Sequence, residues 1–241
     1  MLAASGWWVQ GRTPAQALYD PCCGSGTIAI EAAQIACGIA PGIKRRFAFE
    51  KYLPFQRPAW AAVLQQAQAE QRLAAPGQAC LIFGSDVAHR MIDFAQRNAA
   101  RAGVAQAIEF RGGDALQRMP PLAASPHDGA VLMVNPPYGE RVNVAGVAAR
   151  VAQFGARELA QVTDGGAFLQ QLGNHWKKNY ANWCAWLLSP DLKLPGKLRL
   201  KESRRVPLWN GPIECRLFRF DLQAPPNPKR PSAPVDLYPT P

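Results

Sequence analysis

Short apolar runs alternate with segments of helical periodicity along most of the 241-residue chain. The runs have the length of strands, and the segments between them are long enough for helices that cross a sheet. Strands are expected at 17–22, 80–84, 108–111, 130–134 and 183–189, and helices at 27–37, 87–102, 147–162 and 167–180. This alternation predicts an α/β fold, in which a mostly parallel sheet carries helices on both faces.

Three segments depart from this alternation. Residues 38–77 are too long for a simple crossover, so an insertion with its own helix at 59–73 is expected there. Two β-like segments, 197–206 and 212–222, flank the hairpin turn signal Asn210-Gly211, which predicts an antiparallel C-terminal hairpin. The proline-rich residues 223–241 are expected to lack fixed structure, which leaves one domain over 1–222.

The composition favours a polyanionic partner. The net charge is +10, and the basic clusters near Lys44, Lys177 and Lys201 have aromatic neighbours that suit stacking on bases. No run approaches the roughly 18 apolar residues that span a bilayer, so a cytoplasmic location without a membrane partner is expected. The six cysteines form no CxxC pair and the three histidines are scattered, so no metal site or disulfide framework is expected.

Two polar loops follow the first two predicted strands. The first is a glycine turn that lacks both the third glycine of the dinucleotide fingerprint and the lysine of a P-loop, and it consists of Asp20, Pro21, Cys22, Cys23, Gly24, Ser25, Gly26 and Thr27. It suits a nucleoside-like ligand without a pyrophosphate. The second ends in Asp86, an acid that can accept from both ribose hydroxyls. Glu50 lies nearer the usual spacing but follows no convincing strand, and the alternative for Asp86 is a helix cap.

Two further loops follow the third and fourth predicted strands. Asp114 can accept a hydrogen bond from an exocyclic amine, although an aspartate in a turn is common. The strand 130–134 ends on Asn135-Pro136-Pro137-Tyr138, where the prolines cannot donate to a ladder. The alternative for this motif is a tight proline turn with a packed tyrosine. Because ligands bind at the carboxyl ends of strands in open α/β sheets, we expect all four loops to form one site.

The order DPCCGSGT, GSD, GGDA and NPPY resembles class I S-adenosylmethionine-dependent methyltransferases that methylate amines. DPCCGSGTIAIEAA, the NAxxAGV pattern at 98–104, NPPYGER and NGPIEC resemble more narrowly the THUMP-associated enzymes that make N2-methylguanine in bacterial 23S rRNA, over residues 2–222. The resemblance implies a Rossmann-like, seven-stranded sheet, S-adenosylmethionine as methyl donor and a guanine in 23S rRNA as acceptor, of the guanine-2445 type. Family members usually carry an upstream THUMP domain that this chain lacks, and the second cysteine of the glycine turn is a mild departure.

The same resemblance assigns roles to residues. The glycine turn would hold the methionine part of the cofactor, through Asp20, Cys22, Cys23, Gly24, Ser25, Gly26 and Thr27. Asp86 would bind its ribose and Asp114 its adenine amine. Asn135, which also lines the cofactor, and the carbonyl of Pro136 would accept the two protons of the target amine, and Tyr138 would stack on the flipped base. Two acceptors favour the pyramidal, nucleophilic state of a conjugated amine.

Three other functions remain open. An adenine-N6 DNA methyltransferase shares the NPPY motif, because its target is also a conjugated amine. The same motif also serves on a protein glutamine amide, which the basic charge disfavours. A non-catalytic RNA-binding module with a nucleotide pocket is the alternative outside enzymes.

Overall fold

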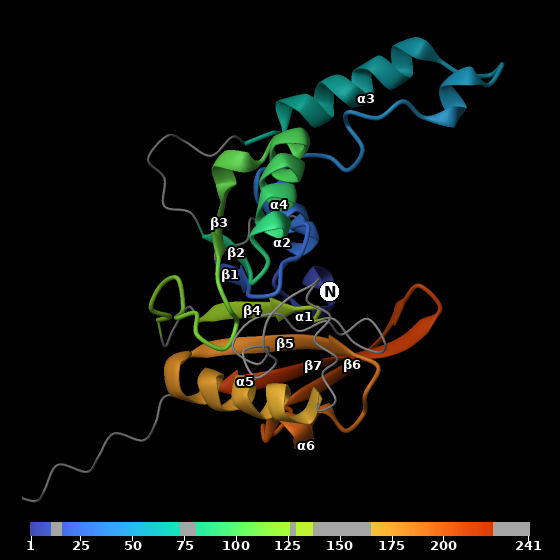
Figure 1. Cartoon of the computed structure of the whole chain (residues 1–241). Coiled ribbons are helices and arrows are strands. Elements are labelled where there is room, and N and C mark those ends of the chain that lie inside the picture. The colour runs from blue at the N-terminus through green and yellow to red at the C-terminus, as the bar shows by residue number, and fades with distance from the viewer. Residues whose placement is uncertain (11–15, 73–80, 126–128, 137–164, 224–241) are drawn as a thin grey trace, which may run out of the picture.

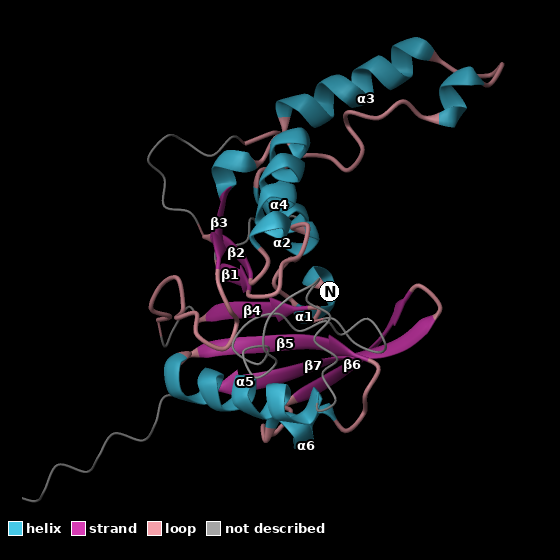
Figure 2. Ribbon diagram, viewed as in Figure 1, coloured by secondary structure: helices cyan, strands magenta, loops and turns pink. Residues whose placement is uncertain are grey.

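A seven-stranded sheet forms the centre of the molecule in the computed structural model, which describes residues 1–10, 16–72, 81–125, 129–136 and 165–223 (Figure 1). Its strands are β1 (Ala17–Asp20), β2 (Ile82–Asp86), β3 (Ile108–Gly112), β4 (Ala130–Val134), β5 (Trp183–Ser189), β6 (Arg204–Asn210) and β7 (Ile213–Leu222). The order across the sheet is β3-β2-β1-β4-β5-β7-β6. The first five strands are parallel, whereas β7 runs antiparallel to both of its neighbours (Figure 2).

This topology confirms the predicted fold. The chain order reverses between β1 and β4, and such a switch point leaves a crevice at the carboxyl ends of the strands. The predicted hairpin is present, but β7 separates β6 from the parallel strands. The turn itself is Gly211-Pro212, with Gly211 at φ +60°, and Asn210 is the last residue of β6.

Helices cover both faces of the sheet. They are α1 (Leu2–Ser5), α2 (Thr27–Ala36), α3 (Arg57–Ala69), α4 (His89–Ala102), α5 (Gly165–Asn179) and α6 (Leu194–Leu198), with 3₁₀ turns η1 (Ala48–Lys51) and η2 (Ala105–Ala107). One core contains residues of α2 and α4, and the other contains residues of α5 and α6. All five residues of β4 are buried because successive side chains enter alternate cores.

An apolar stripe at four-residue spacing, on α5 and at its C-terminal end, lies at the centre of one core. Leu172, Trp176 and Tyr180 are fully buried there, and Phe168 packs against the same cluster. A Cβ on Gly173 would lie 2.1 Å from the carbonyl oxygen of Leu198, so glycine permits the close approach of α5 and α6. The helix expected at 147–162 lies outside the described residues.

The expected strand at 197–206 is wrong in its first half. Residues 194–198 form α6, and the strand begins only at Arg204. The alternation Lys-Leu-Arg-Leu-Lys at 197–201 imitates a strand, but Leu194 and Leu198 are four residues apart and are both buried. That spacing matches one face of a helix, and Pro195 near the start is compatible with a first helical turn.

The insertion extends away from the sheet, as α3 shows in Figure 1. The helix expected at 59–73 is observed at 57–69, and none of its residues is buried. Instead, an aromatic cluster packs within the insertion and comprises Phe47, Phe49, Phe55 and Trp60. The insertion joins the body where Arg72 N donates to Cys37 O (2.7 Å) and Lys44 Nζ to Arg101 O (3.0 Å). These contacts lie at the C-terminal ends of α2 and α4, away from the carboxyl ends of the strands.

Over the described part of the chain, no helix combines the length and apolar character needed to cross a bilayer.

Candidate active site at the carboxyl edge of the sheet

The loop between β1 and α2 turns on two glycines with positive φ angles, +54° at Gly24 and +89° at Gly26. A Cβ on Gly26 would lie 3.0 Å from Ala95 Cβ and 3.1 Å from the Phe110 ring, so Gly26 packs closely against α4 and β3. Among the described residues, a Cβ on Gly24 would find the Met91 side chain alone within 4 Å, at 3.9 Å. No side chain of the described part of the chain caps α2, whose first amides follow Gly26 directly. The loop therefore offers an accessible backbone surface to a ligand.

Asp86 fixes this loop from the neighbouring strand. Its Oδ2 accepts from the amide of Gly24 at 3.0 Å, and its Oδ1 accepts from the amide of Ala88 at 2.9 Å, before α4 begins. The carbonyl of Ser85 also accepts from the amide of Cys23, at 2.9 Å. Asp86 does not cap α4, whose N-cap residue is Ala88 and which has no side-chain cap bond; instead it holds the amide of Ala88 and the glycine loop together.

Two contacts that the residue patterns did not reveal support the loop, one part-buried and one buried. Asn98 Nδ2 donates to the carbonyl of Ser25 at 3.1 Å, from the third turn of α4. Tyr19 Oη and Ser85 Oγ share a hydrogen bond of 2.6 Å between β1 and β2. Asn98 belongs to the NAxxAGV pattern, which was the only signal in the sequence for its role.

Asp20 lies beneath the loop rather than at its surface. Its side chain is 1% exposed, and Oδ1 accepts from the amide of Cys22 at 3.0 Å. Burial raises the pKa of Asp20 to about 7, the Cys22 amide opposes this, and the nearby negative charge of Asp86 adds to it. Burial also raises the pKa values of the Cys22 and Cys23 thiols above their usual range, so neither is an activated nucleophile.

The other two predicted loops follow β3 and β4. Asp114 is half-buried, and its Oδ1 accepts from the amide of Leu116 at 2.9 Å. Asn135 is exposed directly after β4, and Pro136 is buried. Tyr138 lies outside the described residues.

Adjacent strands bring these loops to one edge. Because β1 lies between β2 and β4, the glycine loop has Asp86 on one side and Asn135 on the other, while Asp114 follows β3 beside β2. Glu50 is excluded as the ribose acid, since it lies in η1 of the insertion, where its Oε1 accepts from the amide of Phe47 at 2.7 Å. The edge thus combines carboxylate acceptors, open backbone amides and an exposed amide side chain.

Comparisons with known proteins identify the family and the fold. The RMKL-like methyltransferase domain matches residues 1–219. The ribosomal RNA large subunit methyltransferase K/L of Shewanella baltica is 36% identical over 237 residues, which cover 98% of this chain and 29% of that protein. The chain therefore spans less than a third of the length of this relative.

Two solved structures share the fold. SMU.472, named as a methyltransferase and solved in complex with SAH, has a TM-score of 0.69 and 26% identity, covering 89% of this chain and 50% of its own. A Listeria monocytogenes protein, named as a predicted N6-adenine-specific DNA methylase, has a TM-score of 0.68 and 26% identity, with coverage of 91% and 50%. The family match over nearly the whole described chain, together with this fold, shows that the chain belongs to the RMKL-like methyltransferase domain family.

Proposed function

We propose that this chain transfers a methyl group from S-adenosylmethionine to the exocyclic N2 amine of a guanine in 23S rRNA. The observation that carries the proposal is the position of Asn135 and Pro136 at the end of the buried strand β4, directly beside the strand that leads into the glycine loop. Donor and acceptor would then meet above two adjacent strands. The cofactor supplies an electrophilic methyl group on a sulfonium.

The residues at the edge fit this cofactor. A carboxylate offers about four lone-pair positions, and the amides of Gly24 and Ala88 occupy two of those on Asp86. Two positions would remain for the ribose hydroxyls. The open space around Gly24 would admit the methionine part, and Asp114 would accept from the adenine amine. Asp20 would act indirectly, by holding the Cys22 amide from within the core.

The acceptor side would orient the amine without a strong base. The guanine N2 lone pair is delocalised into the ring, which makes the amine a poor nucleophile. Hydrogen bonds from its two protons to Asn135 Oδ1 and the Pro136 carbonyl would favour the pyramidal state and align the lone pair with the methyl group. We propose that Tyr138 stacks on the flipped base.

The choice of 23S rRNA, and of the guanine-2445 type, rests on the sequence resemblance and on the name of the Shewanella baltica relative. The net charge of +10 supports a nucleic-acid substrate. A cytoplasmic site of action follows from such a substrate. The THUMP domain of family members would add a second RNA-binding unit.

An adenine-N6 DNA methyltransferase is the second candidate, because the similar Listeria monocytogenes structure carries that name. The acceptor geometry proposed for Asn135 and Pro136 serves an adenine N6 amine equally well. Only the product can separate the two.

The deciding experiment incubates the chain with tritiated S-adenosylmethionine and, separately, with unmodified 23S rRNA, DNA and a release factor. Each product is digested and its nucleosides or amino acids are separated. We expect label in N2-methylguanosine from rRNA. Label in N6-methyladenosine, or in protein alone, would contradict the proposal.

A further inference from the structure

The β6–β7 hairpin extends beyond the edge that carries the candidate active site. Ser189, the last residue of β5, pairs with Arg216, but β6 and β7 continue to pair as far as Asn210 and Ile213. Three residues of β7 therefore lie past the end of β5, an overhang of about 10 Å at the rise of a strand. Figure 2 shows the two strands reaching past the rest of the sheet.

The overhanging tip is unusually apolar for an exposed surface. The exposed fraction is 64% for Trp209 and 44% for Ile213, and Leu192, in the loop after β5, is 56% exposed. Trp209 pairs with Glu214 and Ile213 pairs with Asn210, so Trp209 and Ile213 project from opposite faces of the hairpin. Trp209 is therefore the exposed aromatic side chain on its face of the tip. The flat indole of Trp209 is suited to stacking.

The same region carries half of the chain's net charge. Residues 191–219 contain eight Lys and Arg side chains and three acids, against a net charge of +10 for the whole chain. Each acid is already paired, Asp191 with Lys197, Glu202 with Arg205 and Glu214 with Arg216. Lys201 and Arg204, by contrast, make no ion pair with a described residue. An apolar or basic partner would leave these positive charges uncompensated, whereas the negative charges of a phosphate backbone would match them.

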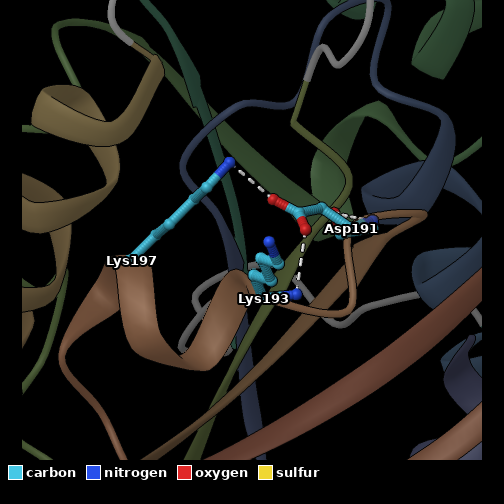
Figure 3. A network of polar contacts seen from close by, with 4 residues as sticks. Asp191, Lys193 and Lys197 are labelled. Atoms are coloured by element: carbon cyan, nitrogen blue, oxygen red, sulfur yellow. Dashed lines mark hydrogen bonds and ion pairs between the residues drawn. The ribbon is translucent and has the colours of Figure 1, made fainter.

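The loop between β5 and α6 is held by its own acid. Asp191 accepts from Lys197 Nζ at 2.7 Å and from the backbone amide of Lys193 at 2.9 Å (Figure 3). The tip of the hairpin is held separately, because β6 and β7 pair along their whole length up to Asn210 and Ile213.

We propose that the hairpin tip binds a single-stranded RNA segment beside the methylated nucleotide, with Trp209 stacked on one of its bases. This inference rests on the proposed function for the identity of the substrate. Strand β6, which carries Trp209, is three strands from β4, about 14 Å across the sheet, so the tip lies within reach of nucleotides that flank a base at Asn135. Bases are available for stacking only where RNA is single-stranded, because paired bases are hidden in the duplex.

The test compares Trp209→Leu with Trp209→Phe. Leucine keeps an apolar side chain but cannot stack, and phenylalanine keeps the aromatic face. With a single-stranded 23S rRNA fragment as probe, we expect Trp209→Leu to weaken binding roughly 5- to 150-fold, the range found for loss of one stacked base. Trp209→Phe should stay within about 3-fold of wild type. The dependence of affinity on salt should be the same in both variants, because no phosphate contact is removed.

Tyr52→Leu is the matched control. Tyr52 is 63% exposed in the basic insertion, but it lies away from the carboxyl edge, so its loss should leave RNA affinity unchanged. S-adenosylmethionine affinity and the unfolding midpoint should be unchanged in all three variants. These two measurements separate a contact with RNA from damage to the fold.

Three outcomes would overturn the inference: RNA affinity of Trp209→Leu equal to wild type, equal losses in the Leu and Phe variants, or an equal loss in Tyr52→Leu. Absence of RNA binding by the wild-type chain would overturn it as well. The proposed function is judged separately, by whether the label enters N2-methylguanosine. If RNA binding depends on Trp209 but no N2-methylguanosine is formed, the proposed methyl transfer is refuted, while the RNA-binding role of the hairpin tip stands.

Discussion

The amide nitrogen of Gly24 lies 3.0 Å from Oδ2 of Asp86, across the boundary between β1 and β2. This bond joins two sequence motifs that are 62 residues apart. It makes Asp86 both a proposed ligand for the ribose and a support for the loop that would hold the rest of the cofactor.

Asp86→Ala should therefore reduce S-adenosylmethionine affinity by more than the loss of the ribose hydrogen bonds alone, because the glycine loop also loses its support. A hydrogen bond to a charged group contributes roughly 1.5–3 kcal/mol, which corresponds to about 10- to 150-fold in affinity. Isothermal titration calorimetry measures the change. Asp93→Asn, at an exposed position on α4, is the control and should bind as wild type. Unchanged affinity in Asp86→Ala would remove Asp86 from the cofactor site.

Asn135→Ala should abolish methyl transfer while leaving S-adenosylmethionine affinity largely intact. Removal of one preorganised hydrogen-bonding group from a reacting centre typically costs about 100- to 1,000-fold in kcat. Single-turnover assays with the rRNA substrate measure this step. Asn174→Ala, on the exposed side of α5, should retain full activity. Equal turnover in Asn135→Ala and wild type would exclude Asn135 from the mechanism.

The pKa of Asp20, raised to about 7, predicts a pH dependence of stability. The folded chain holds the Asp20 proton more tightly than the unfolded chain, whose carboxyl has the ordinary pKa near 4. This contribution to the free energy of unfolding is complete below about pH 4 and is lost as the pH rises through about 7. Asp20→Asn cannot ionise, so its unfolding free energy should fall less between pH 5 and pH 8 than that of wild type. Each unit of the raised pKa corresponds to about 1.4 kcal/mol. Parallel pH profiles of the two proteins would contradict the assignment.

Gly26→Ala should destabilise the fold and weaken cofactor binding together. The new Cβ would meet Ala95 and Phe110 in addition to the strain of a positive φ, for a total of about 2–4 kcal/mol. Gly211→Ala isolates the strain of a positive φ angle, because Gly211 has φ +60° and no described atom within 4 Å of a new Cβ. This substitution should lower the free energy of unfolding by only about 1 kcal/mol. Urea denaturation of both variants measures the difference. Equal losses would mean that packing below the glycine loop is unimportant.

Two strands that are buried on both faces, β4 and β5, were predictable in full, whereas β2, predicted at 80–84, is observed at 82–86. The predictions for β4 and β5 match the structure residue for residue, since each is a continuous apolar run with polar or turn residues at its ends. The error at 197–206 arose because alternating leucines satisfy a strand locally, and only the packing of Leu194 and Leu198 into the core selects a helix. The place of β7 between β5 and β6 was not predicted, because hairpin signals do not say which of the two strands pairs with the sheet.

The positions of the candidate site residues were predictable from chain order, but their contacts were not. Loops that follow parallel strands must share an edge, so Gly24, Asp86 and Asn135 were expected together. The burial of Asp20 depends on side-chain direction at the last residue of β1, which the sequence alone does not determine. The bond from Asn98 to Ser25 depends in turn on how α4 packs against α2.

The strand order also constrains the folding of the chain during synthesis. β6 leaves the ribosome before β7, yet among the described strands it pairs only with β7. Roughly thirty residues separate the end of β5 from the end of β7, so at about 5–20 residues per second β5 waits a few seconds with an unpaired edge. An unpaired strand edge is a template for aggregation. A nascent chain that stalls before Ile213 would therefore expose β5 and leave β6 without a partner, so the sheet closes only when β7 enters between β5 and β6.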